Sequence, residues 1–347
     1  MKDSITYQEI TSQPQALAAS LRAVEERAGD LLDIWQLGYE SIIFTGCGST
    51  YYVSLSAAYA FRKLNHVFSF AIPGGELLLS PHLSSSGELR RTLLVAVSRS
   101  GATTETIQAV ENFKADGAGS VLTITCTAKS PLNSLGDINI AIPEANEKSI
   151  VQTRAFVAMQ LATLAVTAIF AGQTELLSQL QQVPELSAEV LGKNADRMET
   201  LGSDMSLDRI YFLGSGLRYG LACEGSLKMK EMTLTHTEPF HFLEFRHGPK
   251  SMLADTALVV GLLSKAQHSY ETDVLVEARQ SGGGVLALGD AAFDAPDIAS
   301  VSFNSGLDEI AHSLLYLPPL QLLALARASA KGLDPDKPHN LSAVVHL

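Results

Sequence analysis

The stretch IIFTGCG at residues 42–48 indicates the fold, because a close copy, IYFLGSG, follows at residues 210–216. Each copy is a run of β-branched and aromatic residues that ends in Gly-x-Gly, which is typical of a strand turning sharply into a helix. Two more pairs of segments repeat: LLVAV at 93–97 with ALVVG at 257–261, and GSVLTI at 119–124 with GGVLAL at 283–288. The offsets of 168, 164 and 164 residues predict two similar units in tandem.

The elements expected in each repeat alternate between strands and helices. In the first repeat, apolar strands are expected at residues 41–45, 91–97 and 120–125, each followed by polar turn residues. Such alternation predicts an α/β fold, in which helices flank a parallel sheet on both faces. The expected segments are an N-terminal helical segment (1–40), a first α/β unit (41–180), a second α/β unit (193–332) and a polar, proline-rich C-terminal tail (333–347).

Composition and charge narrow the class of protein. The chain has 347 residues and a net charge of −12, which argues against non-specific nucleic-acid binding but leaves room for a local anion site. Its three cysteines form no CxxC pair, so we expect neither a disulfide framework nor a zinc knuckle. The first residues lack an apolar signal core, and the apolar stretch at 156–172 is short for a membrane span. We therefore expect a cytoplasmic protein with no membrane or nucleic-acid partner.

Two polar turns in the first repeat are candidates for an anion site. GCGST at 46–50 follows the first strand, and SRSGAT at 98–103 follows the second. Glycine lets a ligand approach the backbone, hydroxyls donate hydrogen bonds, and helix N-termini attract negative charge. Either turn alone could be an ordinary capped turn. Ligands of open parallel sheets bind beyond the carboxyl ends of the strands, so the pair together predicts a phosphate site.

The second repeat differs at the matching turn. SKAQH at 264–268 keeps only one hydroxyl residue, whereas the turn at 98–103 is rich in them, which predicts a single anion site, in the first repeat. Neither candidate turn has the GxxxxGK[ST] frame of a P-loop, and no GxGxxG fingerprint occurs, so triphosphate and dinucleotide sites are disfavoured.

Other charged and nucleophilic residues admit two interpretations each. On a helix, Glu224, Lys228 and Glu231 share one face; this could be a solvated salt-bridge ladder or, in a dry pocket, a tuned general base. The histidines in HTEPFHFLEFRHGP at 236–249 match no metal-site spacing, and His247 could be structural or functional. No GxSxG elbow occurs, and we expect Cys47 to be a small buried residue rather than a nucleophile.

Taken in order, the motifs resemble those of the double sugar-isomerase (SIS) domain family. The motifs are GCGST at 46–50, SRSGAT at 98–103, EGSLKMKE at 224–231, RHGP at 246–249 and DPDKPHNL at 334–341. The resemblance runs from about residue 40 to the C-terminus. This family includes the isomerase half of glucosamine-6-phosphate synthase, amino-sugar-phosphate deaminases, fructosamine-phosphate deglycases and tagatose-phosphate-type isomerases. The resemblance implies two flavodoxin-like units, commonly assembled as a dimer.

The resemblance also implies roles for individual residues. Glu231 would be the base that moves a proton between C1 and C2 of the sugar, and Lys228 would lie beside the sugar's hydroxyls. His247 would open the ring and would come from the neighbouring subunit, which implies a homodimer. The loop EKSIVQT at 147–153 would also line the substrate. The sugar phosphate would be held by Ser49, Thr50, Ser98, Arg99, Ser100 and Thr103. No metal and no organic cofactor are implied.

Three departures from the family pattern shape the expected activity. Arg99 stands where the synthase usually has glutamine, and it adds a fixed positive charge. Ala343 aligns with a lysine that many members carry, which makes Schiff-base chemistry doubtful. No glutaminase domain precedes the first unit and no cysteine follows Met1, so we expect no glutaminase activity.

The expected function is therefore that of a phosphosugar isomerase or amino-sugar-phosphate deaminase, acting on a hexose or amino-hexose 6-phosphate. Two alternatives stay open: a sugar-phosphate sensor that binds without turnover, and a pure isomerase of a neutral sugar phosphate that releases no ammonia. The sequence leaves open the sugar's stereochemistry and whether it carries nitrogen.

Overall fold

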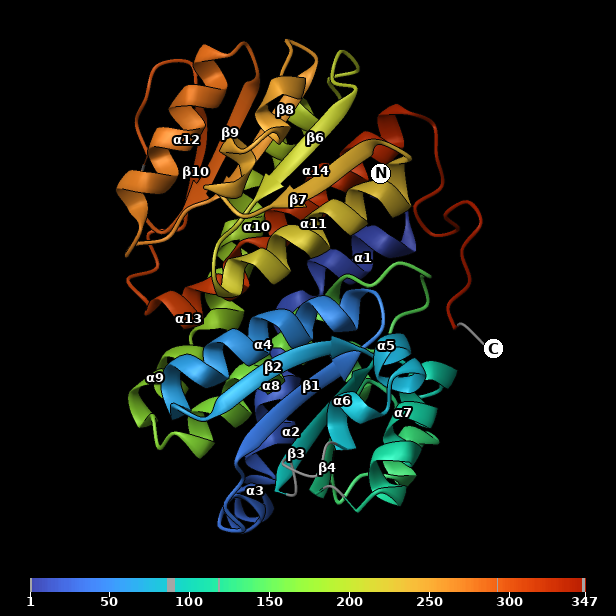
Figure 1. The fold of residues 1–347 in the computed structure, drawn as a ribbon. Coiled ribbons are helices and arrows are strands. Elements are labelled where there is room, and N and C mark those ends of the chain that lie inside the picture. Colours follow the sequence, from blue (N-terminus) through green and yellow to red (C-terminus); the bar gives the residue numbers. More distant parts are fainter. Residues whose placement is uncertain (1, 86–90, 118, 292, 345–346) are drawn as a thin grey trace. The chain divides into compact units, whose positions relative to one another are not determined.

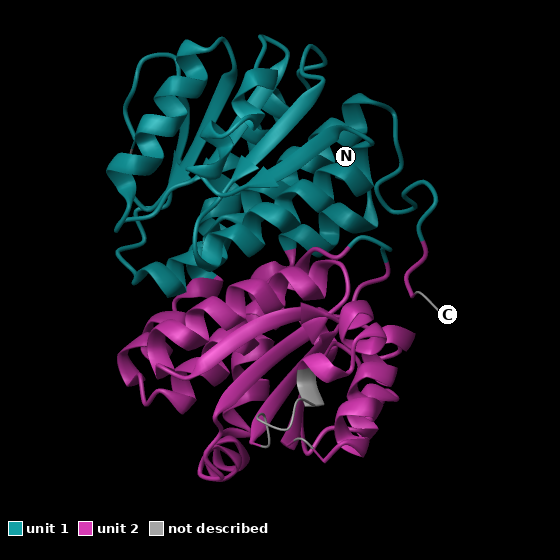
Figure 2. Cartoon of the chain, in the orientation of Figure 1, with its two compact units in different colours: residues 1–11, 149–151, 185–341 teal, residues 12–148, 152–184, 342–347 magenta. Residues whose placement is uncertain are grey.

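The chain divides into two compact units (Figure 2). The computed structural model describes residues 2–85, 91–117, 119–291, 293–344 and 347. Unit 1 comprises residues 1–11, 149–151 and 185–341, and unit 2 comprises residues 12–148, 152–184 and 342–347. The first repeat thus lies in unit 2 and the second repeat in unit 1.

Each unit is built on a five-stranded sheet (Figure 1). The strands of unit 2 are β1 (Ser41–Gly46), β2 (Phe68–Pro73), β3 (Thr92–Ser98), β4 (Gly119–Thr125) and β5 (Ile138–Ala141), in the order β2-β1-β3-β4-β5. Those of unit 1 are β6 (Arg209–Leu213), β7 (His236–Phe240), β8 (Ala257–Leu262), β9 (Gly284–Gly289) and β10 (Ala299–Ser302), in the order β10-β9-β8-β6-β7. All neighbouring strands are parallel. Both sheets therefore have one topology, and the predicted α/β class with two tandem units is confirmed.

Helices connect the strands in both units. In unit 2 they are α2 (Gln13–Glu25), α3 (Ala28–Trp35), α4 (Ser49–Asn65), α5 (Gly74–Leu79), α6 (His82–Ser85), α7 (Thr104–Ala115), α8 (Arg154–Phe170) and α9 (Thr174–Leu180). In unit 1 they are α1 (Ile5–Thr11), α11 (Leu217–Thr233), α12 (His268–Gln280), α13 (Glu309–His312) and α14 (Leu317–Ala330), and α10 (Val183–Gly202) begins at the boundary. Short 3₁₀ turns add η1 (Leu132–Ser134), η2 (Pro143–Ala145), η3 (Glu244–Arg246), η4 (Pro249–Met252) and η5 (Ser313–Leu315).

The central strands are apolar throughout because both faces of each sheet are covered. Every residue of β1 and of β3 is buried, as expected for a parallel sheet between helix layers. In unit 2, Ile43 and Leu94 pack with Phe113 of α7 on one face. In unit 1, Val259 packs with α12 on one face, while Phe212 on the other lies close to Gly225 of α11, which also lies close to Leu320 of α14.

The most apolar helix is buried inside unit 2. All but two residues of α8, which covers most of the apolar stretch at 156–172, are buried. Among the described residues, no helix combines the length and the apolar character that crossing a bilayer requires.

Candidate functional site

The turn between β1 and α4 is shaped by contact with the first turn of the helix. An ideal Cβ on Gly46 would lie only 2.5 Å from Thr50 Oγ1, so no larger residue fits there. Gly48 has φ 57° and ψ −124°, a conformation that favours glycine. Thr50 Oγ1 accepts a hydrogen bond from the Cys47 amide at 2.9 Å and donates one to the Cys47 carbonyl at 2.9 Å. Thr50 therefore builds the turn, and Ser49 begins the helix beside it as a buried residue.

The turn between β3 and α7 carries four of the predicted phosphate ligands. Ser98 Oγ accepts a hydrogen bond from the Gly101 amide at 3.1 Å, and Ser100 Oγ accepts one from the Ala102 amide at 3.1 Å. Thr103 is the N-cap residue of α7. Because β1 and β3 are parallel neighbours, this turn and the turn at 46–50 lie at the same carboxyl edge of the sheet, where open α/β sheets bind ligands.

Arg99 is buried and already has protein partners. Its side chain is 7% exposed, and Nη1 lies 3.6 Å from Oε2 of the fully buried Glu147. Nη2 donates a hydrogen bond to the carbonyl of Ala343 at 3.2 Å, so Arg99 also contacts the C-terminal tail. Glu147 in turn accepts hydrogen bonds from the amide and the hydroxyl of Thr153, both at 2.7 Å. Glu147 is the first residue of the loop predicted to line the substrate but was not among the predicted phosphate ligands, and it contacts both Arg99 and Thr153 of that loop.

A buried charged trio lies on α11 in unit 1. Lys228 is 1% exposed, its Nζ lies 3.4 Å from Oε1 of the fully buried Glu224, and it donates a hydrogen bond to Glu231. Glu231 is 19% exposed and is the member of the trio that reaches solvent. The shared face is therefore not a solvated salt-bridge ladder. It presents one accessible carboxylate whose orientation is fixed by a buried ammonium group.

His247 follows the turn η3 and is exposed. Its segment is held by the buried ring of Phe245 and by Arg246, whose Nη2 lies 2.7 Å from Oε1 of Glu277. The other histidines of the motif have different surroundings. His241 stacks on Tyr219 with ring centroids 3.9 Å apart, and burial lowers its pKa, while His236 lies 3.6 Å from Glu238. Within the described part of the chain, no group of three or more His, Cys, Asp or Glu residues is arranged to hold a metal ion.

The cysteines do not have the surroundings of activated nucleophiles. Burial raises the pKa of the Cys47 thiol and raises the pKa of Cys223 to about 12. Burial also raises the pKa of the fully buried Cys126. Cys47 is partly buried rather than fully buried as expected, but its raised pKa disfavours a nucleophilic role, because a nucleophilic thiol needs a lowered pKa.

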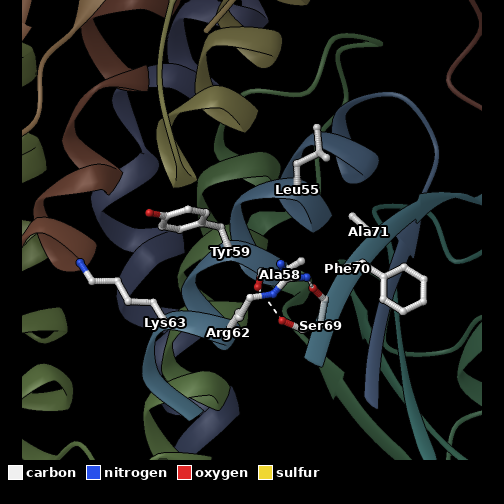
Figure 3. Close-up of a pocket in the computed structure, with 8 residues that line it drawn as sticks. All are labelled: Leu55, Ala58, Tyr59, Arg62, Lys63, Ser69, Phe70 and Ala71. Carbon is white, nitrogen blue, oxygen red and sulfur yellow. Dashed lines mark hydrogen bonds between the residues drawn. The ribbon is translucent and has the colours of Figure 1, made fainter. Parts of the chain in front are cut away.

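The predicted residues form two sets, one in each unit. The two turns predicted to bind phosphate belong to unit 2, whereas Lys228, Glu231 and His247 belong to unit 1. None of these residues lines the cavity of about 450 Å³ between α4 and β2, which Figure 3 shows with Tyr59, Arg62 and Phe70 among its walls. The set in unit 2 provides hydroxyl and amide groups at a sheet edge. The set in unit 1 provides a positioned carboxylate.

Comparison with known proteins then identifies the family. The SIS domain model matches residues 38–171 and 206–295. The chain belongs to the SIS domain family. Its two matched segments are the two repeats, and the double SIS architecture that the motifs indicated is confirmed.

One relative of this SIS protein is a named aminotransferase. It is 29% identical over 350 residues to the glutamine–fructose-6-phosphate aminotransferase (isomerizing) of Methanothermobacter thermautotrophicus, over 99% of this chain and 57% of that protein. The chain therefore spans little more than half the length of this relative.

Solved structures resemble the whole chain. Glucosamine-6-phosphate deaminase from Thermotoga maritima has a TM-score of 0.81 and 28% identity, over 99% of this chain and 100% of that chain. Tagatose-6-phosphate ketose/aldose isomerase from Escherichia coli has a TM-score of 0.87 and 25% identity, over 96% of this chain and 95% of that chain.

Proposed function

We propose that this SIS protein is a phosphosugar aldose–ketose isomerase or amino-sugar-phosphate deaminase, acting on a hexose or amino-hexose 6-phosphate. The observation that carries the proposal is the pair on α11, in which the buried Lys228 holds the partly exposed carboxylate of Glu231. A positioned carboxylate is the group that proton transfer between neighbouring carbons requires. The names of three relatives support the substrate class, because each refers to a 6-phosphate of a hexose or hexosamine.

The proposed reaction begins with binding of the phosphate at the two turns of unit 2. Ser49, Thr50, Ser98, Arg99, Ser100 and Thr103 are the proposed ligands. Amides and hydroxyls at a helix N-terminus suit a phosphate dianion. Arg99 adds positive charge, although Glu147 lies 3.6 Å from it, so we assign Arg99 to shaping the turn as well as to binding.

Proton transfer follows ring opening, for which His247 is the proposed acid–base group. Glu231 takes a proton from the carbon beside the carbonyl or imine, giving an enediol or enolamine, and returns the proton to the neighbouring carbon. Where C2 carries an amine, water then adds to the resulting imine and ammonia leaves. Lys228 keeps the carboxylate oriented throughout.

A sensor that binds a sugar phosphate without turnover is the second candidate. Ala343 favours it, because this tail residue aligns with a lysine in many family members and its carbonyl is bound by Arg99. The third candidate is a pure isomerase that acts on a neutral sugar phosphate.

Proton NMR in heavy water separates these candidates. The protein is added to a panel of hexose and hexosamine 6-phosphates. Loss of the C1 or C2 proton signal supports proton-transfer catalysis, and release of ammonium distinguishes a deaminase from an isomerase. Binding of a sugar phosphate without exchange of either proton would favour the sensor.

Replacing Glu231 tests the base directly. Glu231→Gln removes the proton acceptor while keeping the side chain's size, so we expect turnover to fall by about 10²–10⁴-fold with little change in sugar-phosphate binding. Glu199→Gln, an exposed residue of α10, is the matched control and should retain full turnover. Wild-type turnover in Glu231→Gln would remove Glu231 from the mechanism.

A further inference from the structure

The turn after β8 in unit 1 is built like the turn after β3 in unit 2. In unit 2, Ser98 Oγ accepts a hydrogen bond from the amide three residues later, at 3.1 Å. In unit 1, Ser264 Oγ accepts one from the Gln267 amide, also three residues later, at 2.9 Å. The turns after the adjacent strands also agree, since Gly216 has φ 60° and ψ −131° and Gly48 has φ 57° and ψ −124°. Both repeats therefore keep the backbone of an anion-binding turn.

A carboxylate of the chain itself occupies this turn in unit 1. Glu271 lies in the first turn of α12 and its side chain is 2% exposed. One of its oxygens accepts a hydrogen bond from the Ser264 amide at 2.5 Å, and the other lies 3.5 Å from Nη2 of Arg218. Arg218 follows Gly216 by two residues, as Thr50 follows Gly48, so the arginine comes from the position that matches Thr50.

The positive charge of Arg218 is balanced by nearby carboxylates. The Arg218 side chain is 5% exposed, and its Nη1 donates a hydrogen bond to Glu309 at 2.5 Å. Its Nε is buried and has no hydrogen-bond partner within the described ranges. The nearby cation Lys265 is paired with Asp290 at 2.8 Å. Because a buried charge without a partner is strongly unfavourable, Arg218 needs the charge of Glu271 as well as that of Glu309.

We propose that unit 1 contains a carboxylate-binding site whose occupant is the chain's own Glu271, so that the turn after β8 takes no external phosphate. The donors fit a planar carboxylate, because the Ser264 amide and the Arg218 guanidinium each face one of its two oxygens. The three hydroxyls at Ser98, Ser100 and Thr103 are reduced here to that of Ser264, so tetrahedral coordination of phosphate is lost. The site lies wholly in unit 1 and does not depend on the reaction proposed above.

Acetate provides the test, because the CH₂–COO⁻ group that Glu271→Ala removes has the same size and charge as acetate. We expect sodium acetate to raise the melting temperature of Glu271→Ala until the effect saturates, whereas sodium chloride at equal ionic strength should not. A ligand that binds the native state stabilises that state by mass action. A crystal of this variant grown in acetate should show one acetate on the Ser264 amide and Arg218. Asp273→Ala, which removes an exposed carboxylate from the same helix, is the control and should not respond.

Two kinds of result would overturn the proposal. One concerns acetate: either a response of Glu271→Ala no larger than that of Asp273→Ala, or an equal response in the double variant Glu271→Ala/Arg218→Leu. If Glu271→Ala cannot be obtained folded, Glu271→Gln decides the matter. Its amide oxygen keeps an acceptor for Ser264 but removes the charge facing Arg218, so we expect a lower melting temperature. A wild-type melting temperature in Glu271→Gln is the second contrary result.

Discussion

At the scale of single residues, Lys228 has the most demanding surroundings in the proposed site. Its ammonium group is almost fully buried between Glu224 and Glu231, and Glu224 is completely buried. Removing the lysine would leave a buried carboxylate without this cation, which costs far more than losing an exposed ion pair. Lys228 therefore stabilises the fold by pairing with Glu224, and it supports the proposed chemistry by orienting Glu231.

Lys228→Met tests the stabilising role when it is compared with Lys230→Met. Lys230 is exposed on the same helix. We expect Lys228→Met to lower the free energy of unfolding by about 3–5 kcal/mol because of the uncompensated carboxylate, and Lys230→Met to change it by less than about 0.5 kcal/mol. Urea unfolding measures both. Adding Glu224→Gln to Lys228→Met should recover part of the loss. Equal stability of the two single lysine variants would contradict this account.

The candidate site could be predicted from the sequence only as far as local motifs reach. The hydroxyl-rich turns and the Glu224–Lys228–Glu231 face follow from spacing along one turn or one helix. The pairing of Arg99 with Glu147 could not be predicted in this way. Glu147 lies in a loop that follows two further strands, and the periodicity of helices and strands does not indicate which residues such a loop contacts. A buried arginine requires a counter-charge, but only the fold selects which acid supplies it.

At the scale of elements, the β1–α4 turn depends on a glycine for space. A Cβ on Gly46 would lie 2.5 Å from Thr50 Oγ1 and 2.8 Å from the Thr50 carbonyl carbon, whereas a Cβ on Gly29 in α3 would meet nothing within 4 Å. We expect Gly46→Ala to destabilise the protein by about 1–3 kcal/mol through overpacking and to weaken binding of the sugar phosphate. Gly29→Ala should instead stabilise by about 0.5–1 kcal/mol, because alanine favours a helix. Unfolding curves with the same sign for both variants would refute the steric argument.

Helix α1 is capped by a residue from the other end of the sequence. Asp336 accepts hydrogen bonds from the Ile5 amide at 2.9 Å and from the Thr6 amide and hydroxyl at 2.7 Å. Burial alone would raise the pKa of Asp336, but the hydrogen bonds from Thr6 and Ile5 outweigh it and lower the pKa. Stability from this group is therefore present above the unfolded pKa of about 3.9 and is lost as the pH falls below it toward the folded value.

Asp336→Asn tests this cap. We expect a loss of about 1 kcal/mol in unfolding free energy at neutral pH, as for other capping residues. The difference from wild type should shrink as the pH falls below about 4. Urea unfolding over this pH range measures it, with the exposed Asp273→Asn as the control. A difference that stays constant with pH would show that the carboxylate charge is not what stabilises the cap.

The central elements of the fold could be predicted, but the edge strands could not. The expected strands at 41–45, 91–97 and 120–125 correspond to β1, β3 and β4, because these are continuous apolar runs. The edge strand β5 is short and only half-buried, and β7 lies inside the motif at 236–249 and contains Pro239. Edge strands lack the apolar signature of central ones, and proline is tolerated there, so the pattern of the sequence does not mark them.

At the scale of the whole molecule, the homodimer implied by the family resemblance can be tested by mixing inactive variants. His247 is exposed on unit 1, and we propose that it completes the site of a neighbouring subunit. His247→Ala and Glu231→Gln should each be inactive alone. If dissociated and reassembled at equal amounts, half of the dimers would be mixed and each would have one intact site, so about a quarter of wild-type activity should return. No recovery in reassembled mixtures, with mixed dimers detected by native mass spectrometry, would place His247 in the same subunit's site.

The cap on α1 also bears on how the chain folds as it is synthesised. Residues 1–11 belong to unit 1, whereas the residues that follow them belong to unit 2, and the Thr6–Asp336 hydrogen bond spans 330 positions. During synthesis on the ribosome, most strands of unit 2 can pair before Asp336, the partner of α1, has been made. Contacts of such long sequence separation form late and slowly. A nascent chain stalled before residue 336 should therefore leave α1 open to protease, although the sheet of unit 2 is already assembled.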